Sequence, residues 1–367
     1  MQILNGLLFD GFTFTKKDLF FENERITAPR TGSDTLDASG CYVIPGMIDI
    51  HTHGCSGFDF IDADANGLKK MDQWYLQNGV TSVAATLITA QRDTMLSALA
   101  EISAYAAKNP GSTICACRAE GPFLSPSRAG AHDIHLLSLP DIEFAEQMLS
   151  ASNGLLRILD IDPCLDGAGA LIRHFANRLH LSLAHTPCTQ EEALKAHAAG
   201  ANGITHMFNA MAPIHHRAPA MLGAFAESTL TAELICDGIH VYPSLLKLLF
   251  LCDSERVCMI SDSMAGCGMA DGVYTLGGAR ITVKESRAFN AEGTLAGSVC
   301  SVPQGLSMLV NEGIALEKAA ASATRIPAKL LGREDIGNLH AGSYADIVIL
   351  SPKLAPIHVI KRGKLLF

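Results

Sequence analysis

The chain has 367 residues, of which 48% are hydrophobic and 18% are charged, and its formal net charge is −9. This length is sufficient for one large α/β barrel with a smaller domain, and the apolar content excludes a disordered protein. The negative charge argues against a nucleic-acid partner, whereas an anionic small substrate would need only a local basic pocket.

We expect neither a secretory signal nor a membrane span. No basic segment followed by an apolar run opens the sequence, and no apolar run reaches about 18 residues without a charge or a turn former. The 11 cysteines are odd in number and scattered along the chain. That usage is typical of reduced thiols, so the sequence predicts a cytoplasmic protein without a disulfide framework and without a membrane partner.

Both ends of the chain have the pattern of short β-strands separated by turns. Residues 1–44 contain turn formers such as Asn5-Gly6, and residues 333–367 contain strand candidates at 344–350 and 357–361. We expect the two ends to pair as one small discontinuous β-sandwich domain. Residues 45–332 would then form the catalytic domain between them.

Within residues 45–332, apolar runs of strand length alternate with stretches of helical spacing. The runs are 46–51, 80–87, 112–119, 155–161, 180–185, 202–206, 230–236 and 256–261. Among the helices, one is expected to begin after Thr189 as N-cap, and the last to run from Leu316 to Leu331. Eight alternating units favour a (β/α)₈ TIM-like barrel over a doubly wound sheet. Gly167-Ala168-Gly169 begins like a dinucleotide fingerprint, but Ile172 breaks that pattern.

Two histidines follow the first of these runs. Residues i and i+2 of a strand point to the same side, so His51 and His53 can converge just past the strand's C-terminal end. Two converging imidazoles suit a transition-metal ion. On its own, this spacing more often marks two unrelated loop histidines.

Further polar residues end the later runs in the same way. Glu120, His185, His206, the pair Asp237 and His240, and Asp262 each follow a different apolar run. In a barrel these positions are the C-terminal strand ends, where such enzymes keep their active sites. A lone buried histidine is usually a core residue, but several metal-type residues on different strands favour a metal site.

Eight short segments spread over nearly the whole chain form a recognisable series. They are Pro45-Gly46-Met47-Ile48-Asp49, His51-Thr52-His53-Gly54, Glu120-Gly121-Pro122-Phe123, Gly130-Ala131-His132, Thr205-His206-Met207-Phe208-Asn209-Ala210-Met211, Asp237-Gly238-Ile239-His240, Ser261-Asp262 and Leu295-Ala296-Gly297-Ser298. In this order they resemble the amidohydrolase superfamily and, within it, the family of N-acetylglucosamine-6-phosphate deacetylases.

The resemblance implies a metal-dependent hydrolase with one or two divalent ions. Glu120, His185 and His206 would hold one ion, and His51 and His53 a second that shares Glu120 as a bridge. Zinc is the first choice, with iron, cobalt, manganese or nickel as alternatives. The resemblance also places Asp262 at the metal centre as the catalytic acid–base group, and His132 near the substrate carbonyl.

The resemblance further implies the residues that bind an amino-sugar phosphate and a homodimer, in which His240 reaches the neighbouring subunit's site. The substrate-binding positions would be Ala131, His132, Asn209, Ala210, Arg217, His240, Leu295, Ala296 and Gly297. One departure lies beside Arg217, where Ala218-Pro219-Ala220 replaces the family's usual Glu-Pro-Gly and puts the loop geometry and sugar preference in question.

Elementary chemistry agrees with these roles. Amide hydrolysis needs an activated water, a polarised carbonyl and a proton for the departing amine, which a metal ion and a carboxylate such as Asp262 can supply. His132 could stabilise the oxyanion, and the planar fork of Arg217 suits a phosphate. Arg217 taken alone would more often be a solvated surface charge.

The expected reaction is hydrolysis of the acetamide of N-acetyl-D-glucosamine 6-phosphate to D-glucosamine 6-phosphate and acetate, in amino-sugar catabolism. The galactosamine epimer is the first alternative. A cyclic-amide amidohydrolase, such as a dihydroorotase, is disfavoured because no lysine ends a strand and Glu120 takes the bridging place. A non-catalytic sugar-phosphate sensor is disfavoured because it would have no use for Asp262.

Overall fold

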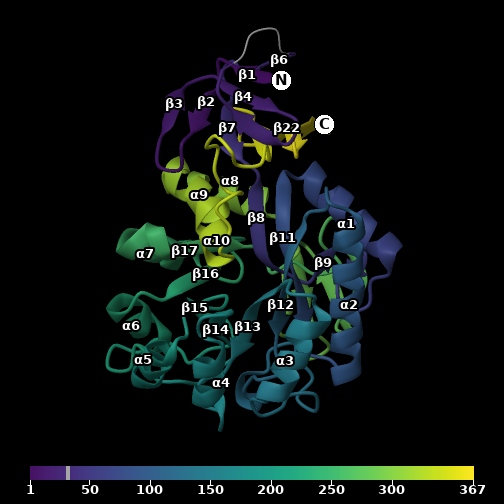
Figure 1. The fold of residues 1–367 in the computed structure, drawn as a ribbon. Helices are drawn as coiled ribbons and strands as arrows, with labels where there is room; N and C mark the ends of the chain where they lie inside the picture. Colours follow the sequence, from purple (N-terminus) through teal and green to yellow (C-terminus); the bar gives the residue numbers. More distant parts are fainter. Residues whose placement is uncertain (30–33) are drawn as a thin grey trace.

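The computed structural model describes residues 1–29 and 34–367. Figure 1 shows a barrel surrounded by helices, with the strands from both ends of the chain gathered on one side of it. The barrel carries the candidate site.

The barrel is an eight-stranded parallel sheet in the order β17-β16-β15-β14-β13-β12-β11-β8. Its strands are β8 (Met47–Thr52), β11 (Val80–Ile88), β12 (Ile114–Glu120), β13 (Leu156–Ile161), β14 (His180–Leu183), β15 (Gly203–Ile204), β16 (Thr231–Ile235) and β17 (Val257–Ile260). Beyond β17, the Asp262 N–H donates to the His51 carbonyl at 2.9 Å, which joins the two outer strands. The predicted (β/α)₈ architecture is confirmed, and each strand matches one of the eight apolar runs.

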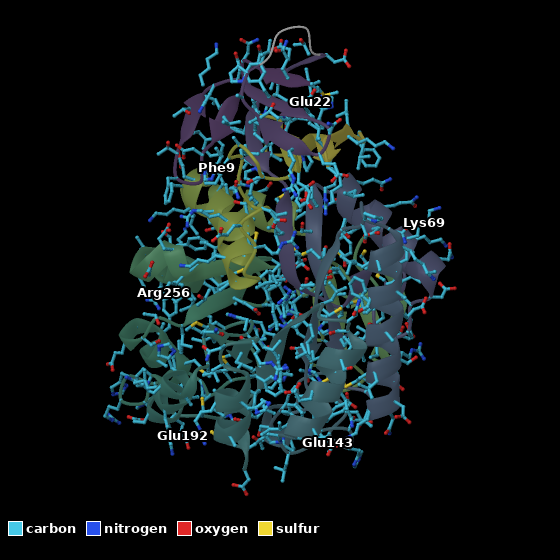
Figure 2. All side chains as sticks on the ribbon, viewed as in Figure 1. Phe9, Glu22, Lys69, Glu143, Glu192 and Arg256 are labelled. Carbon is cyan, nitrogen blue, oxygen red and sulfur yellow. The ribbon has the colours of Figure 1, made fainter. Side chains whose placement is uncertain are left out.

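Helices follow the barrel strands and cover them from outside. They are α1 (Ala65–Gln77), α2 (Arg92–Lys108), α3 (Ile142–Ala151), α4 (Ala168–Phe175), α5 (Gln190–Ala199), α6 (Ala220–Glu227), α7 (Pro243–Asp253), α8 (Val302–Asn311), α9 (Leu316–Ala323) and α10 (Arg325–Leu330). Helix α5 begins at the predicted N-cap, where Thr189 and Glu192 form a capping box. Lys69, Glu143 and Glu192 lie on the outer faces of α1, α3 and α5 (Figure 2). Within the described residues, no helix combines the length and apolar character that crossing a bilayer needs.

The last predicted helix, Leu316 to Leu331, is wrong as a single element. The structure breaks it into α9 and α10 at Thr324, whose φ of −132° and ψ of −85° are not helical. Pro327 accounts for the break, because in a continuous helix its ring would clash with the carbonyl four residues earlier.

Strands from the two ends of the chain share one six-stranded sheet, in the order β23-β22-β21-β7-β2-β3. Its strands are β2 (Leu7–Phe9), β3 (Phe14–Lys16), β7 (Tyr42–Pro45), β21 (Ile347–Leu350), β22 (Pro356–Lys361) and β23 (Lys364–Leu365). A four-stranded sheet of β1 (Gln2–Leu4), β4 (Leu19–Glu22), β5 (Arg25–Thr27) and β6 (Thr35–Asp37) accompanies it. Ile3, Phe21, Val43 and Ile347 belong to one buried apolar cluster between these strands. The domain boundaries after residues 44 and 332 stay a prediction.

Two smaller sheets and two short 3₁₀ turns have no counterpart in the sequence prediction. The strands are β9 (Gly54–Cys55), β10 (Phe58–Asp59), β18 (Gly272–Leu276), β19 (Ala279–Lys284) and β20 (Arg287–Phe289), and the turns are η1 (Pro126–Arg128) and η2 (Ser254–Arg256). Gly277 and Gly278 join β18 to β19, which is a recognisable hairpin signal. Leu276, at the end of β18, lines the cavity described below.

Candidate active site

The six metal-type residues of the sequence analysis come together at the C-terminal ends of five barrel strands. His51 lies in β8, with His53 just beyond it, and Glu120 ends β12; His185, His206 and Asp262 each lie two residues beyond β14, β15 and β17. All six are buried. The carboxyl ends of parallel strands meet at one edge, which explains why residues distant in sequence converge here.

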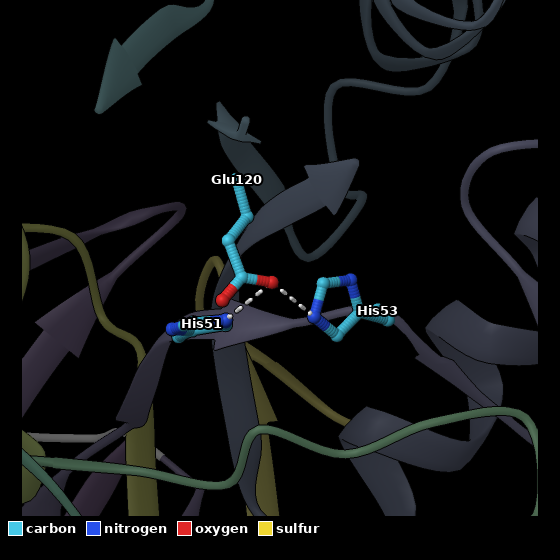
Figure 3. A group of neighbouring side chains, drawn as sticks. All are labelled: His51, His53 and Glu120. Atoms are coloured by element: carbon cyan, nitrogen blue, oxygen red, sulfur yellow. Dashed lines mark ion pairs between the residues drawn. The ribbon is translucent and has the colours of Figure 1, made fainter. Parts of the chain in front are cut away.

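Glu120 lies at the centre of this cluster. Its Oε2 is 2.9 Å from Nε2 of His53 and 3.5 Å from Nε2 of His51 (Figure 3). Its other oxygen, Oε1, is 3.1 Å from Nε2 of His185 and 2.9 Å from Nε2 of His206. One carboxylate thus faces two pairs of histidines, one pair through each oxygen.

The donor set fits divalent metal ions. Two groups, His51–His53–Glu120 and Glu120–His185–His206, each offer ligand atoms within 4.8 Å of one another. Nε2 of His51 is buried and has no hydrogen-bond partner among the described residues, so no protein group competes through a hydrogen bond for this ligand atom. Imidazole nitrogens and a carboxylate are ligands that zinc and related ions prefer.

The other ring nitrogens of two of these histidines are held by partners. Nδ1 of His51 is 3.2 Å from Glu233, and Nδ1 of His185 is 2.7 Å from the carbonyl of Arg128. Such contacts fix the orientation of a ligating ring.

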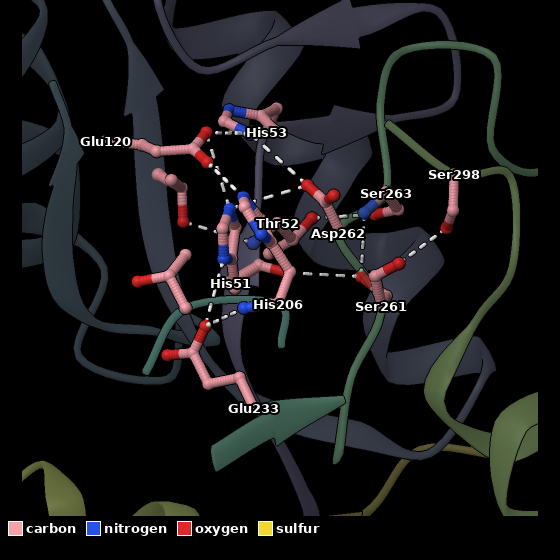
Figure 4. A network of polar contacts seen from close by, with 12 residues as sticks. His51, Thr52, His53, Glu120, His206, Glu233, Ser261, Asp262, Ser263 and Ser298 are labelled. Carbon is pink, nitrogen blue, oxygen red and sulfur yellow. Dashed lines mark hydrogen bonds and ion pairs between the residues drawn. The ribbon is translucent and has the colours of Figure 1, made fainter. Parts of the chain in front are cut away.

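Asp262 faces the same cluster. Its Oδ1 is 3.4 Å from Nε2 of both His51 and His53 (Figure 4). Burial raises the pKa of Asp262, but the charge on His51 and the hydrogen bond from His53 outweigh it and bring the pKa to about 2. The carboxyl group is therefore ionised at neutral pH and can accept a proton.

His132 also faces Glu120, with 3.6 Å between Nε2 and the oxygen Oε2. Its Nδ1 is 2.8 Å from the Thr89 hydroxyl. Burial lowers the pKa of His132 to about 4, despite the hydrogen bond to Glu120 that opposes this shift. His132 is therefore a neutral imidazole at pH 7.

A cavity of about 340 Å³ opens over this cluster. The predicted substrate-binding residues that line it are Ala131, His132, Asn209, Ala210, His240, Leu295, Ala296 and Gly297, and five of the metal-type residues (His53, Glu120, His185, His206 and Asp262) line it as well. His51 is fully buried beneath them. His240 lines the cavity of its own chain, and its Nδ1 is 2.6 Å from Asp237. Burial lowers the pKa of His240, but the hydrogen bond to Asp237 outweighs it, so the net pKa is raised.

Arg217 is not among the described residues that line the cavity. It lies on an exposed loop, where its Nη1 contacts Nε2 of His216 at 2.6 Å. Arg128, which the sequence analysis missed, does line the cavity, and its Nε is buried without a hydrogen-bond partner among the described residues. The sequence feature that could have indicated Arg128 is its position in the loop between Glu120 and His132.

A buried charge network beneath the cluster was also missed. Arg118 is fully buried and pairs with Asp160 at 2.9 Å and with Glu233 at 2.5 Å. Burial raises the pKa of Glu233, but the charge on Arg118 and the hydrogen bond with His51 outweigh it and bring the pKa to about 2. The available signal was the presence of charged residues inside apolar strand runs.

The model of the amidohydrolase family matches residues 42–366. The chain belongs to the amidohydrolase family. The N-acetylglucosamine-6-phosphate deacetylase of Bacillus subtilis (strain 168) is 36% identical over 334 residues, which cover 89% of this chain and 84% of that protein. The N-acetylgalactosamine-6-phosphate deacetylase of Escherichia coli O157:H7 is 33% identical over 326 residues, which cover 88% and 86% of the two chains.

A solved structure gives a similar result. A mutant N-acetyl-D-glucosamine-6-phosphate deacetylase from Mycobacterium smegmatis, in complex with N-acetyl-D-glucosamine-6-phosphate, superposes with a TM-score of 0.94 at 31% sequence identity. The match covers 100% of this chain and 98% of that one.

Proposed function

We propose that this protein is a metal-dependent deacetylase that hydrolyses the acetamide of N-acetyl-D-glucosamine 6-phosphate to D-glucosamine 6-phosphate and acetate. The observation that carries the proposal is one cavity that joins the histidine–Glu120 cluster, Asp262 and the predicted sugar-binding residues. The relatives named above, which match most of both chains, support the same substrate.

Asp262 would transfer protons, and His132 would stabilise the negative charge that develops on the substrate. Asp262, ionised and beside the cluster, would take the proton of the attacking water and return it to the departing amine. His132, neutral and near Glu120, would donate a hydrogen bond to the carbonyl oxygen as negative charge develops there. Glu120 and the four histidines would hold the ion or ions. A bound divalent ion would supply Lewis-acid chemistry by polarising the carbonyl and acidifying water.

The metal is proposed to be zinc, because the ligands are imidazoles and a carboxylate. Iron, cobalt, manganese and nickel accept similar donors and stay as alternatives. The presence of both ligand groups supports capacity for two ions, with Glu120 shared between them.

The phosphate is proposed to be held by Arg217 and His240, as the resemblance implies. Arg128 also lines the cavity, together with Glu120 and Asp262, and its Nε is buried without a hydrogen-bond partner among the described residues. An anionic group would therefore be drawn toward Arg128 and away from the two carboxylates.

Two further proposals concern the protein in the cell. All eleven cysteines are free, which supports a reducing compartment and hence a cytoplasmic location. A homodimer, with His240 serving the neighbouring site, rests on the resemblance, whereas in this chain His240 lines its own cavity. Light scattering after gel filtration would test the dimer, and a monomer with full activity would reject it.

Acetate release from the two epimeric substrates, with and without a chelator, tests the proposed function. We expect faster turnover of the glucosamine epimer, loss of activity after metal removal, and recovery on adding zinc. Faster turnover of N-acetyl-D-galactosamine 6-phosphate would favour the second candidate, which the relative from Escherichia coli supports. Acetate release that is unchanged after complete metal removal would reject the metal-dependent reaction.

A cyclic-amide substrate is less well supported. No lysine is found among the described residues that line the cavity, and Glu120 takes the place between the two histidine pairs. Hydrolysis of a cyclic amide in the same assay, in place of the sugar phosphates, would reverse this choice.

A further inference from the structure

Glu233 is a buried carboxylate that contacts the metal-type residues without lining the cavity. It lies in β16, and its Oε2 is 3.2 Å from Nδ1 of His51. The same oxygen is 3.4 Å from the backbone N–H of His206. Figure 4 shows Glu233 below His51, on the side of the ring away from Glu120. Glu233 therefore contacts one residue from each candidate ligand group.

Arg118 holds Glu233 in this position. The five N–H donors of Arg118 match five hydrogen bonds in number: two to Asp160 at 3.0 and 2.9 Å, one to Glu233 at 2.5 Å, one to Thr205 at 3.0 Å and one to the Ile50 carbonyl at 3.3 Å. A guanidinium with every donor in use has little freedom to move. Its bond to Oε1 leaves Oε2 of Glu233 directed at His51.

The partner of Nδ1 determines the tautomer of His51. A carboxylate that is paired with Arg118 only accepts hydrogen bonds, so the proton at this contact lies on Nδ1 of His51. A histidine that ligates a metal ion is neutral, so in the ligating ring the lone pair lies on Nε2. Nε2 is the atom that is buried without a hydrogen bond and lies 3.5 Å from Glu120. Among the described residues, none of the other three cluster histidines has a carboxylate at Nδ1.

We propose that Glu233, anchored by Arg118, is a positioning residue for the His51–His53 half of the metal centre. Its carboxylate holds the His51 ring with the proton on Nδ1 and with Nε2 available to bind an ion. The proposal rests on the metal-dependent function proposed above, but it concerns ion binding and not turnover. Outer carboxylates of this kind typically contribute 10–100-fold to metal affinity.

Asp160 provides a matched control. It is as buried as Glu233 and also pairs with Arg118, but no cluster histidine contacts it. A variant at Asp160 therefore reports the cost of disturbing the buried network alone. A variant at Glu233 adds the loss of the His51 contact.

The test is titration of Zn²⁺ into metal-free protein, with a chelating dye as competitor and elemental analysis for stoichiometry. We expect Glu233→Gln to lower the affinity for one of two ions by about 10–100-fold and to leave the affinity for the other within about threefold of wild type. Asp160→Asn should leave both ions within about threefold. In a His51→Ala background, Glu233→Gln should have no further effect, because Glu233 acts through that ring.

Several results would overturn the proposal. Three concern affinity: an equal loss of affinity for both ions, the same loss with Asp160→Asn, or an additive loss in the His51→Ala background. The fourth is that the wild-type protein binds a single ion and that His51→Ala leaves this binding unchanged. Because no substrate is present, these outcomes are independent of whether the protein deacetylates a sugar phosphate.

A measurement on the wild-type protein covers the case in which the Glu233 variant does not fold. Long-range ¹H–¹⁵N correlation of the zinc-loaded protein, with ¹⁵N-labelled histidine, reports the tautomer of each ring. We expect His51 to carry its proton on Nδ1 and to bind through Nε2. A His51 ring without a proton on Nδ1 would overturn the proposal, whatever the variants do.

Discussion

Three of the six metal-type residues hold their backbones in the left-handed region. The φ angles are +44° at His185, +27° at His206 and +49° at Asp262. Side chains other than glycine rarely adopt such values, and each costs roughly 1–3 kcal/mol unless its surroundings hold it. At Asp262 two backbone hydrogen bonds do so, one to the His51 carbonyl and one from the Ser298 N–H at 2.7 Å. The strained turns direct these side chains inward at the strand ends.

The proposed role of Asp262 predicts a specific loss. Asp262→Asn should lower kcat/KM for the sugar phosphate by about 10²–10⁴-fold, because an amide cannot accept the water's proton. The fold and most of the bound metal should be retained, as checked by circular dichroism and elemental analysis. Asp72→Asn is the control, because Asp72 is a buried carboxylate that contacts Tyr105 and Thr113 away from the site. Near-normal turnover of Asp262→Asn would remove this residue from the mechanism.

Arg217 and Arg128 predict a contrast between substrates. A charged hydrogen bond contributes about 1.5–3 kcal/mol, and about 1.4 kcal/mol is tenfold. Arg217→Ala should therefore lower kcat/KM for the phosphorylated sugar by roughly ten- to more than a hundredfold. Arg128→Ala should lower it by about tenfold or more if the anion lies beside Arg128. Steady-state rates on both sugars give the comparison, since neither variant should change the slow hydrolysis of unphosphorylated N-acetylglucosamine.

Lys69→Ala removes one positive charge from the exposed face of α1 and is the control for net charge. Equal losses on both sugars would mean that an arginine supports its loop and not the phosphate. A loss with Arg128→Ala alone would place the anion beside η1 and away from the exposed loop of Arg217.

The six metal-type residues could be predicted because each ends or follows an apolar run, whereas the substrate-binding positions came only from the resemblance to the family. Arg118 and Glu233 could not be predicted in this way, because they lie inside their runs and their charges are paired only in three dimensions. The exposed position of Arg217 was equally inaccessible, since it depends on the conformation of a loop.

At the level of elements, the close approach of β8 to β11 makes one glycine essential. A Cβ on Gly46, between β7 and β8, would lie 2.0 Å from Oγ1 and 2.4 Å from Cγ2 of Thr81. Gly46→Ala should therefore destabilise the protein by about 1–3 kcal/mol or more through overpacking. Urea unfolding would measure this, with Gly111→Ala as the control because a Cβ there meets nothing within 4 Å. An equal effect of the two substitutions would contradict the packing argument.

The elements show which local signals determine the structure. Eight apolar runs became barrel strands because a strand covered on both faces is mostly apolar, as in Val80–Ile88, where every residue is buried. The three-stranded sheet of β18 to β20 was missed because its strands alternate buried and exposed residues and lack such runs. The helix formers between Leu316 and Leu331 predict one helix, but Pro327 prevents a continuous one.

For the whole molecule, buried neutral histidines predict sensitivity to acid. Burial lowers the pKa of His180 to about 4, and its Nε2 has no hydrogen-bond partner among the described residues. The unfolded chain, with a histidine pKa near 6.5, binds more protons than the folded chain between about pH 6.5 and pH 4. The contribution of His180 to the free energy of unfolding is therefore fully present above about pH 6.5 and is lost as the pH falls toward 4.

His180→Leu should reduce this acid sensitivity. The change in unfolding free energy between about pH 7 and pH 5 should be smaller by about 2 kcal/mol than in wild type. Urea unfolding of metal-free protein at both pH values would measure it. His132 titrates over the same range and stays in both proteins, so some acid sensitivity should remain. An unchanged pH dependence would mean that His180 is not buried as a neutral ring.

The pairing of the two chain ends also affects how the protein folds during its synthesis. Strand β7 needs β21 along one edge, with Val43 opposite Ile349, yet a ribosome makes these residues about 300 positions apart. At a synthesis rate of about 5–20 residues per second, β7 is made roughly 15–60 s before β21. During that interval it is an open strand edge that other chains can join. The synthesis of β21 therefore closes a strand edge at which the nascent protein is open to aggregation.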